Sequence, residues 1–339
     1  MALIPGLPEE IGLECLIRLP YTCHHAARSV CRRWRELIDG RDFFQLRKQR
    51  GTTHVLACLV QSSPAKIPAD GKKPTGPPAY RLTVFDTRLG KWECLPAVPI
   101  YPDGLPLFCQ LVGLQGKLVV MGGWDPSSWD PVLHLFVYDF TRREWRQGRD
   151  MPAARSFFAA GAVDDRRVVV AGGHDENKNA LKTASVYDVE SDEWEAAEEM
   201  EEERDECEGV VVGGEFWVVS GYRTDRQGSF SGSAEVYESA TGGWRRVEGA
   251  WEGGKCPRGR VKVERSGRVG CWSEEETVAV QVAVGMGDRA LLTGSACHGA
   301  AHGFFLVVEQ KEGQNGKMEK MDAGKEFSGF VQSGCCIEI

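Results

Sequence analysis

Three residues near the carboxyl end carry side chains that could bind a metal ion. Cys297, His298 and His302 form this cluster in a sequence that has only seven histidines. A structural zinc site usually takes four ligands in paired spacings, and copper or iron would need clustered His, Tyr or Glu side chains. No C-x-x-C pair occurs. We therefore interpret the three residues as loop residues and expect no metal, no cofactor and no catalytic residue.

Thiol and phosphate chemistry have equally weak support. The twelve cysteines are scattered, and the opening MALIPGLPEE lacks the basic and apolar regions of a secretory signal. No run of 18 apolar residues occurs, so we expect a soluble protein of the cytoplasm, the nucleus or both, with reduced cysteines. Gly122 and Gly123 resemble part of a phosphate loop, but no Lys-Ser/Thr pair follows them. We interpret this diglycine as structural.

Charge is unevenly distributed along the chain. The formal net charge is -8, yet residues 1–50 hold nine Lys/Arg and six Asp/Glu. We expect neither nucleic acid nor a membrane as a partner, because binding phosphates needs a concentrated positive field. Residues 190–208 contain twelve Asp/Glu and one Arg. This acidic run is interpreted as a solvated loop edge, and a contact for a basic patch on a partner is the alternative.

Short helices are predicted at the start of the chain. Pro8, followed by two glutamates, suits the first turn of a helix over about residues 8–18, since carboxylates favour the positive end of the helix dipole. Pro20 ends this helix. A second helix with an apolar stripe should cover about residues 24–38 and close before Gly40. Helices this short need the rest of the chain or a partner to cover their apolar faces.

The order and spacing of residues in these helices resemble a known motif. The segments LPEEI, LECLIRLP, SVCRRWRELI and DFF, within residues 3–47, resemble the F-box. The resemblance implies a small helical bundle that binds the Skp-family adaptor of a Skp, cullin and F-box ubiquitin ligase. A plain helical hairpin that caps the next domain is the alternative. The positions that match, and that we take as adaptor-binding residues, are Leu7, Pro8, Ile11, Leu16, Leu19, Pro20, Val30, Cys31, Trp34 and Leu37.

A repeat with a period near 50 residues occupies the remainder. Each copy has an aromatic residue followed by an acid, and a tryptophan seven positions after that aromatic residue. These tryptophans are Trp92, Trp145, Trp194 and Trp244, spaced by 53, 49 and 50 residues. An apolar strand that ends in small residues, such as Gly122-Gly123, precedes the later copies. This pattern resembles the kelch repeat, which implies a β-propeller whose diglycines allow blades to approach closely.

The length after the helices predicts a ring of five or six blades. The sequence predicts two domains, an F-box over residues 1–50 and a kelch propeller over residues 51–339. RVGCW and TVAVQV are taken as two strands of the fifth blade. That blade should be degenerate, because only about 23 residues separate Trp272 from the next strand end, in ALLTGS. FFLVV and residues 318–321 should form later strands of the final blade. The segment EFSGFVQSGCCIEI should close the ring by pairing with the first blade. Trp145, Trp194 and Trp244 should be buried at equivalent places.

The combination of both motifs is similar to a plant group of kelch-repeat F-box proteins. The runs LIPGLP, LRKQR and FSGFVQSGCCIEI look like that group in particular. Its members recruit phenylalanine ammonia-lyase or cytokinin response regulators for ubiquitination, so the resemblance implies a non-catalytic substrate receptor. A propeller scaffold or a catalytic propeller, unrelated to ubiquitination, is the alternative.

Three loops at the same place in successive repeats are the candidates for binding a substrate protein. They cover residues 124–131, 174–179 and 222–231, and equivalent loops of a ring emerge on one face. Aromatic and arginine side chains are common interface anchors. The candidate substrate-binding residues are Trp124, Trp129, His174, Tyr222, Arg223 and Arg226.

Overall fold

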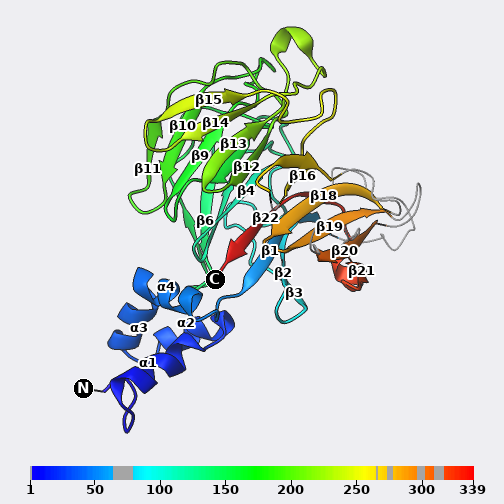
Figure 1. Cartoon of the computed structure of the whole chain (residues 1–339). Helices are drawn as coiled ribbons and strands as arrows, with labels where there is room; N and C mark the ends of the chain where they lie inside the picture. Colours follow the sequence, from blue (N-terminus) through cyan, green and yellow to red (C-terminus); the bar gives the residue numbers. More distant parts are fainter. Residues whose placement is uncertain (1, 64–78, 265, 273–277, 296–301, 309–316) are drawn as a thin grey trace.

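Helices occupy the first fifty residues of the chain, and strands make up most of the rest (Figure 1). This computed structural model describes residues 2–63, 79–264, 266–272, 278–295, 302–308 and 317–339. The arrangement confirms the predicted class of fold, in which an all-α segment precedes a β-propeller. No helix in the described part of the chain is long and apolar enough to span a membrane.

The helical segment is more divided than the sequence suggested. In chain order it contains α1 (Glu9–Ile17), η1 (Tyr21–Cys23), α2 (His24–Arg28), α3 (Arg32–Ile38) and α4 (Arg41–Gln49). The prediction of one helix over residues 24–38 is wrong. The backbone of Cys31 is extended, with φ -159° and ψ 166°, and its Sγ accepts a hydrogen bond from the backbone N of Trp34 at 3.4 Å. Cys31 therefore caps a new helix.

The strands form six sheets, which we number as blades in chain order. Blade 1 holds β22 (Val331–Glu338), β1 (Val55–Ser62), β2 (Tyr80–Asp86) and β3 (Lys91–Cys94). Blade 2 holds β4 (Gln110–Leu114), β5 (Lys117–Met121), β6 (Leu135–Asp139) and β7 (Glu144–Gln147). Blade 3 holds β8 (Ala159–Ala162), β9 (Arg167–Ala171), β10 (Ala184–Asp188) and β11 (Glu193–Ala196). Blade 4 holds β12 (Glu208–Val212), β13 (Glu215–Val219), β14 (Ala234–Glu238) and β15 (Gly243–Val247). Blade 5 holds β16 (Val261–Val263) and β17 (Val269–Cys271). Blade 6 holds β18 (Ala279–Met286), β19 (Arg289–Ser295), β20 (His302–Val308) and β21 (Lys317–Met321).

The strand named first for each blade lies nearest the ring axis. In blade 1 this strand is β22, which closes the ring. In blade 1, β22 pairs antiparallel with β1 in a register that sets Cys335 opposite Cys58, although the two strands are far apart in sequence (Figure 1). On its free side β22 packs against β4 and β18, the inner strands of the neighbouring blades. The predicted closing strand is confirmed, as are the predicted final strands β20 and β21.

The ring has five full blades and one reduced one. Blade 5 is a two-stranded sheet between two four-stranded blades, so the predicted degenerate fifth blade is confirmed. The assignment of TVAVQV to that blade is wrong, because β18 pairs with β19 and starts blade 6. RVGCW does lie in blade 5, where it contains β17 and the backbone N of Trp272 donates to the carbonyl of Arg260 at 2.8 Å. The buried ring of Trp272 packs against blade 6, with Val278 and Leu292.

The repeated aromatic pair joins each blade to the one before it. In blade 2 the ring of Trp145 lies 5.0 Å from that of Tyr138, and its indole N–H donates to the carbonyl of Pro96 at 2.9 Å. Trp194 and Trp244 repeat this bond to the carbonyls of Arg149 and Glu198. The three indoles are half-buried. The prediction of equivalent places is confirmed, but the tryptophans are less buried than predicted. They lie on the outermost strand of each blade and have a neighbouring strand on one side only.

The diglycines have the predicted close-approach role. Gly173 has a φ of +80°, and a Cβ there would lie 2.3 Å from the carbonyl oxygen of Ser156. Gly172 has a φ of +69°, and its Cβ would lie 2.7 Å from the carbonyl oxygen of Arg204, which precedes blade 4. Any side chain at either position would push away the backbone segment that enters a blade there.

Candidate interaction faces

The predicted adaptor-binding residues fall into two groups. Leu16 is buried, and Leu19, Trp34 and Leu37 pack half-buried around it in the small helical core. The others face solvent, and three of them are large apolar side chains: Leu7 is 37% exposed, Ile11 50% and Val30 63%. Pro8, Pro20 and Cys31 are exposed too. The first group therefore builds the helical core, and the second leaves an apolar surface without a partner among the described residues.

A buried arginine ties the helices to one another, and a buried tyrosine fixes them to the ring. The guanidinium of Arg47 donates from Nη1 to the carbonyls of Ile17 and Leu19, both at 2.6 Å, and from Nη2 to that of Thr52 at 2.9 Å. Tyr21 packs in the core shared by blades 1 and 2, and its hydroxyl donates to Glu93 at 3.2 Å. Buried polar groups need hydrogen-bond partners, so these contacts hold the helices and the ring in one arrangement.

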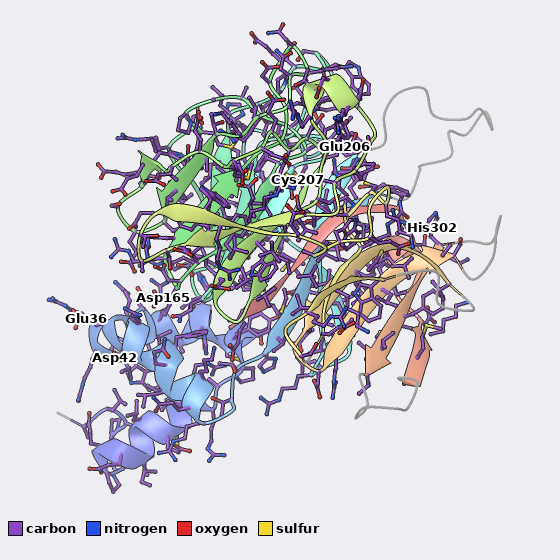
Figure 2. All side chains as sticks on the ribbon, turned by 45° about the horizontal axis from the view of Figure 1, so that its top comes forward. Glu36, Asp42, Asp165, Glu206, Cys207 and His302 are labelled. Carbon is purple, nitrogen blue, oxygen red and sulfur yellow. The ribbon has the colours of Figure 1, made fainter. Side chains whose placement is uncertain are left out.

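Ion pairs extend this join over one face of the ring. Asp39 of the helical segment lies 3.3 Å from Arg142 in the turn between β6 and β7, and Lys48 lies 2.8 Å from Glu338 on β22. Arg41 pairs with Asp165 in the turn between β8 and β9. Figure 2 shows Asp165 on the side of the helices and Glu206 well away from them. The helices thus cover the face that carries these turns, and the predicted substrate loops emerge on the other face.

His24 makes the helical segment sensitive to acid. Its ring is buried against Phe43, and burial together with the nearby Arg47 lowers the pKa of His24 to about 4. The unfolded side chain should titrate near its usual pKa of about 6.5, so the folded state loses stability as the pH falls from 6.5 towards 4. We expect a loss of about 2 kcal/mol at pH 5. Urea denaturation should show this loss between pH 7.5 and pH 5, and His24→Leu should remove most of it. An equal pH dependence in the variant would contradict the assignment.

Three of the predicted substrate-binding residues hold equivalent positions beside the diglycines. One backbone β-bridge joins each of these residues to the segment that enters its own blade. The three residues are Trp124, His174 and Tyr222. The half-buried Trp124 donates its indole N–H to Ser156. Nδ1 of the buried His174 lies 2.8 Å from Oδ1 of Asp205, and the buried Tyr222 donates its hydroxyl to Glu206 at 3.1 Å. Trp124 and His174 therefore connect neighbouring blades, and His174 and Tyr222 present little surface to a partner.

The other three candidates are exposed. Trp129 is 55% exposed and has a left-handed backbone with φ 62°. Lys178 holds the equivalent place in the turn of blade 3, also at φ 62°, so that turn forms without an aromatic side chain. Arg223 and Arg226 lie at the turn η2 (Thr224–Arg226) of blade 4 and are exposed. The structure thus leaves these three side chains free to meet a partner, and their role in binding stays a prediction.

Sequence analysis missed a second repeated position, at the entry to the inner strands. Phe108, Phe157 and Glu206 each precede an inner strand with a left-handed φ of 61°, 55° and 49°. Phe108 and Phe157 lie 4.9 Å apart, and the guanidinium of Arg258 from the entry to blade 5 lies 4.0 Å from the ring of Phe157. Aligning the repeats at this position would have revealed the series, but not the contact of Arg258 across the ring.

The acidic run is more structured than a solvated loop. Glu199 pairs with Lys182 at 2.8 Å, Glu202 pairs with Arg246 at 2.9 Å, and Asp205 is buried beside His174. Glu198 and Glu201 remain exposed. Of the three residues interpreted as loop residues, Cys297 and His298 lie outside the described residues. His302 is exposed at the first position of β20, so that interpretation is wrong for His302. Within the described ranges, no group of three or more His, Cys, Asp or Glu side chains is placed to hold a metal.

The two faces define a class of protein in which a small helical module is fixed to one face of a propeller. The chain matches the F-box domain over residues 4–46 and the kelch motif over residues 107–152 and 155–201. It is 43% identical to the Arabidopsis thaliana F-box/kelch-repeat protein At2g44130 over 282 residues, which cover 76% of this chain and 68% of that protein. It is 36% identical to the Arabidopsis thaliana F-box/kelch-repeat protein At1g15670, with 100% of both chains covered. The chain belongs to the F-box/kelch-repeat family.

A solved structure agrees with the fold. The structure of YjhT matches with a TM-score of 0.56 at 14% identity, over 78% of this chain and 98% of that chain. At this identity the likeness shows the propeller alone. The resemblance to plant F-box/kelch-repeat proteins is confirmed. The F-box implies a Skp adaptor as a partner, and the kelch domain implies binding to another protein.

Proposed function

We propose that this chain is the substrate-recognition subunit of a Skp, cullin and F-box ubiquitin ligase. The observation that supports this most is the exposed apolar group Leu7, Ile11 and Val30 on a helical segment whose other contacts fix it to the ring. Of nine large apolar side chains that are exposed in the described residues, these three lie within the first thirty positions. Three exposed large apolar side chains on so short a segment suit a protein partner that covers them.

The face of the propeller opposite the helices holds the protein to be ubiquitinated. In this proposal the chain contributes no catalytic residue, and a separate conjugating enzyme transfers ubiquitin. The rigid join between the helices and the ring keeps the substrate at a fixed position relative to that enzyme, which raises its effective concentration. We propose phenylalanine ammonia-lyase as the substrate, with a response regulator as the other candidate, and the cytoplasm or the nucleus as the place of action.

Replacing Trp129, Arg223 and Arg226 together by alanine tests the substrate face. We expect ubiquitination of phenylalanine ammonia-lyase, in a ligase reconstituted from purified parts, to fall at least about tenfold, because exposed aromatic and arginine anchors often contribute 2 kcal/mol or more each. Adaptor binding should be unchanged. The matched control replaces three exposed residues, Arg88 and Leu89 in the β2 to β3 turn and Lys91 at the start of β3, and should have no effect.

Two outcomes would count against parts of the proposal. If the triple variant ubiquitinates the lyase at the normal rate, the substrate site lies elsewhere on the chain. If the unmodified protein binds the adaptor but never modifies the lyase, the choice of substrate is wrong and the role as a receptor stands.

A further inference from the structure

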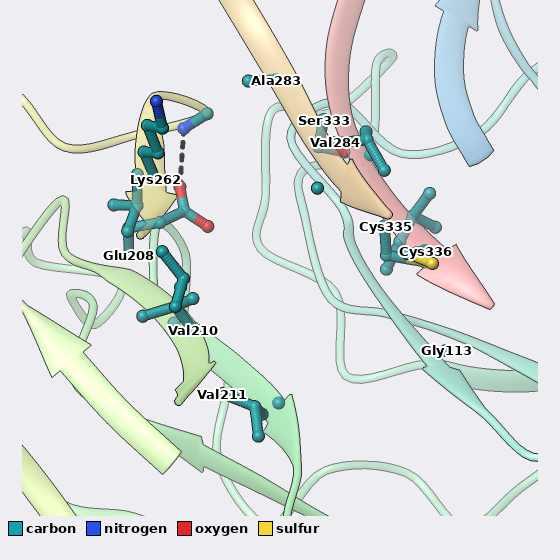
Figure 3. Close-up of a pocket in the computed structure, with 18 of the residues that line it drawn as sticks. Gly113, Glu208, Val210, Val211, Lys262, Ala283, Val284, Ser333, Cys335 and Cys336 are labelled. Atoms are coloured by element: carbon teal, nitrogen blue, oxygen red, sulfur yellow. Dashed lines mark hydrogen bonds between the residues drawn. The ribbon is translucent and has the colours of Figure 1, made fainter. Parts of the chain in front are cut away.

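A cavity runs along the axis of the ring and has an unusual lining. Its volume is about 720 Å³, within the range of roughly 300–1,000 Å³ common for small-molecule sites. The wall consists of the inner strands, each of which is hydrogen-bonded to a neighbouring strand on only one side. Backbone N–H and C=O groups therefore face the cavity between small aliphatic side chains, among them Ala160, Val210, Val284 and Ala290. Figure 3 shows Val210 and Glu208 on one wall, with Val284 and Cys336 across the cavity.

The charged groups of this lining are mainly cationic. Arg258, Lys262 and Arg289 line the cavity together with two carboxylates, Glu208 and Glu264, in a chain whose net charge is -8. Lys262 lies over the ring of Trp272 at 4.4 Å. Oε2 of Glu208 accepts a hydrogen bond from the backbone N of Gly259 at 2.7 Å, and burial raises the pKa of this carboxyl. A positive lining inside an acidic protein favours an anionic ligand.

Arg258 supplies the group that such an anion would meet. Its guanidinium lies over the rings of Phe157 and Phe108, at 4.0 Å and 5.7 Å from their centroids. Nη1 is buried and has no hydrogen-bond partner among the described residues. Its nearest compensating carboxylates are those of Glu208, bound to Gly259, and Glu206, which accepts from Tyr222. Burial lowers the pKa of Arg258, as expected for a cation that lacks close pairing.

We propose that the axial cavity binds a small organic carboxylate, held by Arg258 and with its apolar body against the aliphatic wall. Arg258 lines the cavity, and a carboxylate that reached its guanidinium could accept two N–H groups in parallel, the unpaired Nη1–H among them. The unpaired N–H groups along the inner strands provide further donors. This inference does not depend on the proposed function, because the cavity lies inside the ring, apart from both the exposed apolar group on the helices and the exposed substrate residues.

Thermal denaturation and calorimetry of the full chain test the proposal, with acetate, hexanoate and benzoate as probes. We expect hexanoate or benzoate, at up to about 10 mM, to raise the melting temperature in a saturable way. The neutral amides hexanamide and benzamide should have no effect. Arg258→Met should weaken carboxylate binding at least about tenfold, because a hydrogen bond to a charged group contributes about 1.5–3 kcal/mol. Arg149→Met, at an exposed arginine outside the cavity, is the matched control and should bind normally.

A second variant tests the proposal if the loss of Arg258 disturbs folding. Gly285 lines the cavity, and a Cβ built there meets no atom within 4 Å. Gly285→Leu should therefore fold and fill the space, so that carboxylate binding is lost while Arg258 is intact. The proposal fails if no carboxylate raises the melting temperature of the unmodified protein, if the amides act equally well, or if both variants bind with unchanged affinity.

Discussion

Replacing Leu7 and Pro8 together by alanine should abolish co-purification with a Skp-family adaptor and leave the ring folded. Leu7 is 37% exposed, so its loss removes an anchor for a partner and little of the helical core. Pro8 precedes α1 with φ -53° and ψ 150°, and its ring presets the start of the helix that carries Ile11. Because central anchors often contribute 2 kcal/mol or more each, adaptor affinity should fall at least about a hundredfold.

Leu89→Ala is the matched control for this experiment, since Leu89 is an equally apolar residue, 48% exposed, on the propeller. It should bind the adaptor normally. The measurement is the dissociation constant of the purified pair, with circular dichroism to confirm that each variant is folded. Wild-type affinity in the double variant would show that the helical segment does not bind an adaptor in the way that we propose.

Arg204→Ala should destabilise the propeller by about 3–5 kcal/mol, the usual result of removing one partner from a buried ion pair. The side chains of Arg204 and Glu235 are each 1% exposed, and Nε lies 3.0 Å from Oε1. The same guanidinium donates to the carbonyls of Ser220 and Ser233, at 2.8 Å and 3.2 Å. The substitution would leave Glu235 charged and buried without its main partner.

Urea denaturation measures this effect, and two further variants interpret it. Arg226→Ala removes an exposed arginine of the same blade and should change the free energy of unfolding by less than about 0.5 kcal/mol. Arg204→Met combined with Glu235→Gln removes both charges, so it should recover a large part of the lost stability. If Arg204→Ala alone unfolds at the wild-type urea concentration, the buried pair does not stabilise the blade.

Local and repeated features of the fold could be predicted from the sequence. The Tyr to Trp spacing is set within one blade by the pairing of neighbouring strands, as when Tyr187 lies opposite Trp194, so it recurs wherever a blade recurs. The apolar stripe over residues 24–38 misled the prediction, because a three-residue interruption at Cys31 preserves the helical period while it ends the helix. The fourth helix was not predicted, because Arg47 lies on its buried side. An arginine is normally expected at the surface, and only the structure shows the backbone carbonyls that Arg47 binds.

The missed features depend on contacts between distant residues. His174 reads as a loop residue, yet its Nδ1 lies 2.8 Å from Oδ1 of Asp205, 31 positions later, inside the protein. Arg258 meets Phe157 across the ring, and nothing in either local sequence indicates that contact. The exposed apolar positions of the F-box could be predicted, because the order of residues along short helices defines that motif and needs no contact between distant residues.

The pairing of β22 with β1 has a consequence for synthesis of the protein on the ribosome. The residues of the helical segment have all been made after about fifty positions, but blade 1 lacks its inner strand until residue 338 has been made. Throughout translation β1 therefore carries an unpaired edge, and the nascent ring is open to association with other chains. A premature stop codon that removes β22 alone would leave the propeller unclosed but the F-box able to bind its adaptor. Such a truncated product should occupy ligase complexes without delivering a substrate.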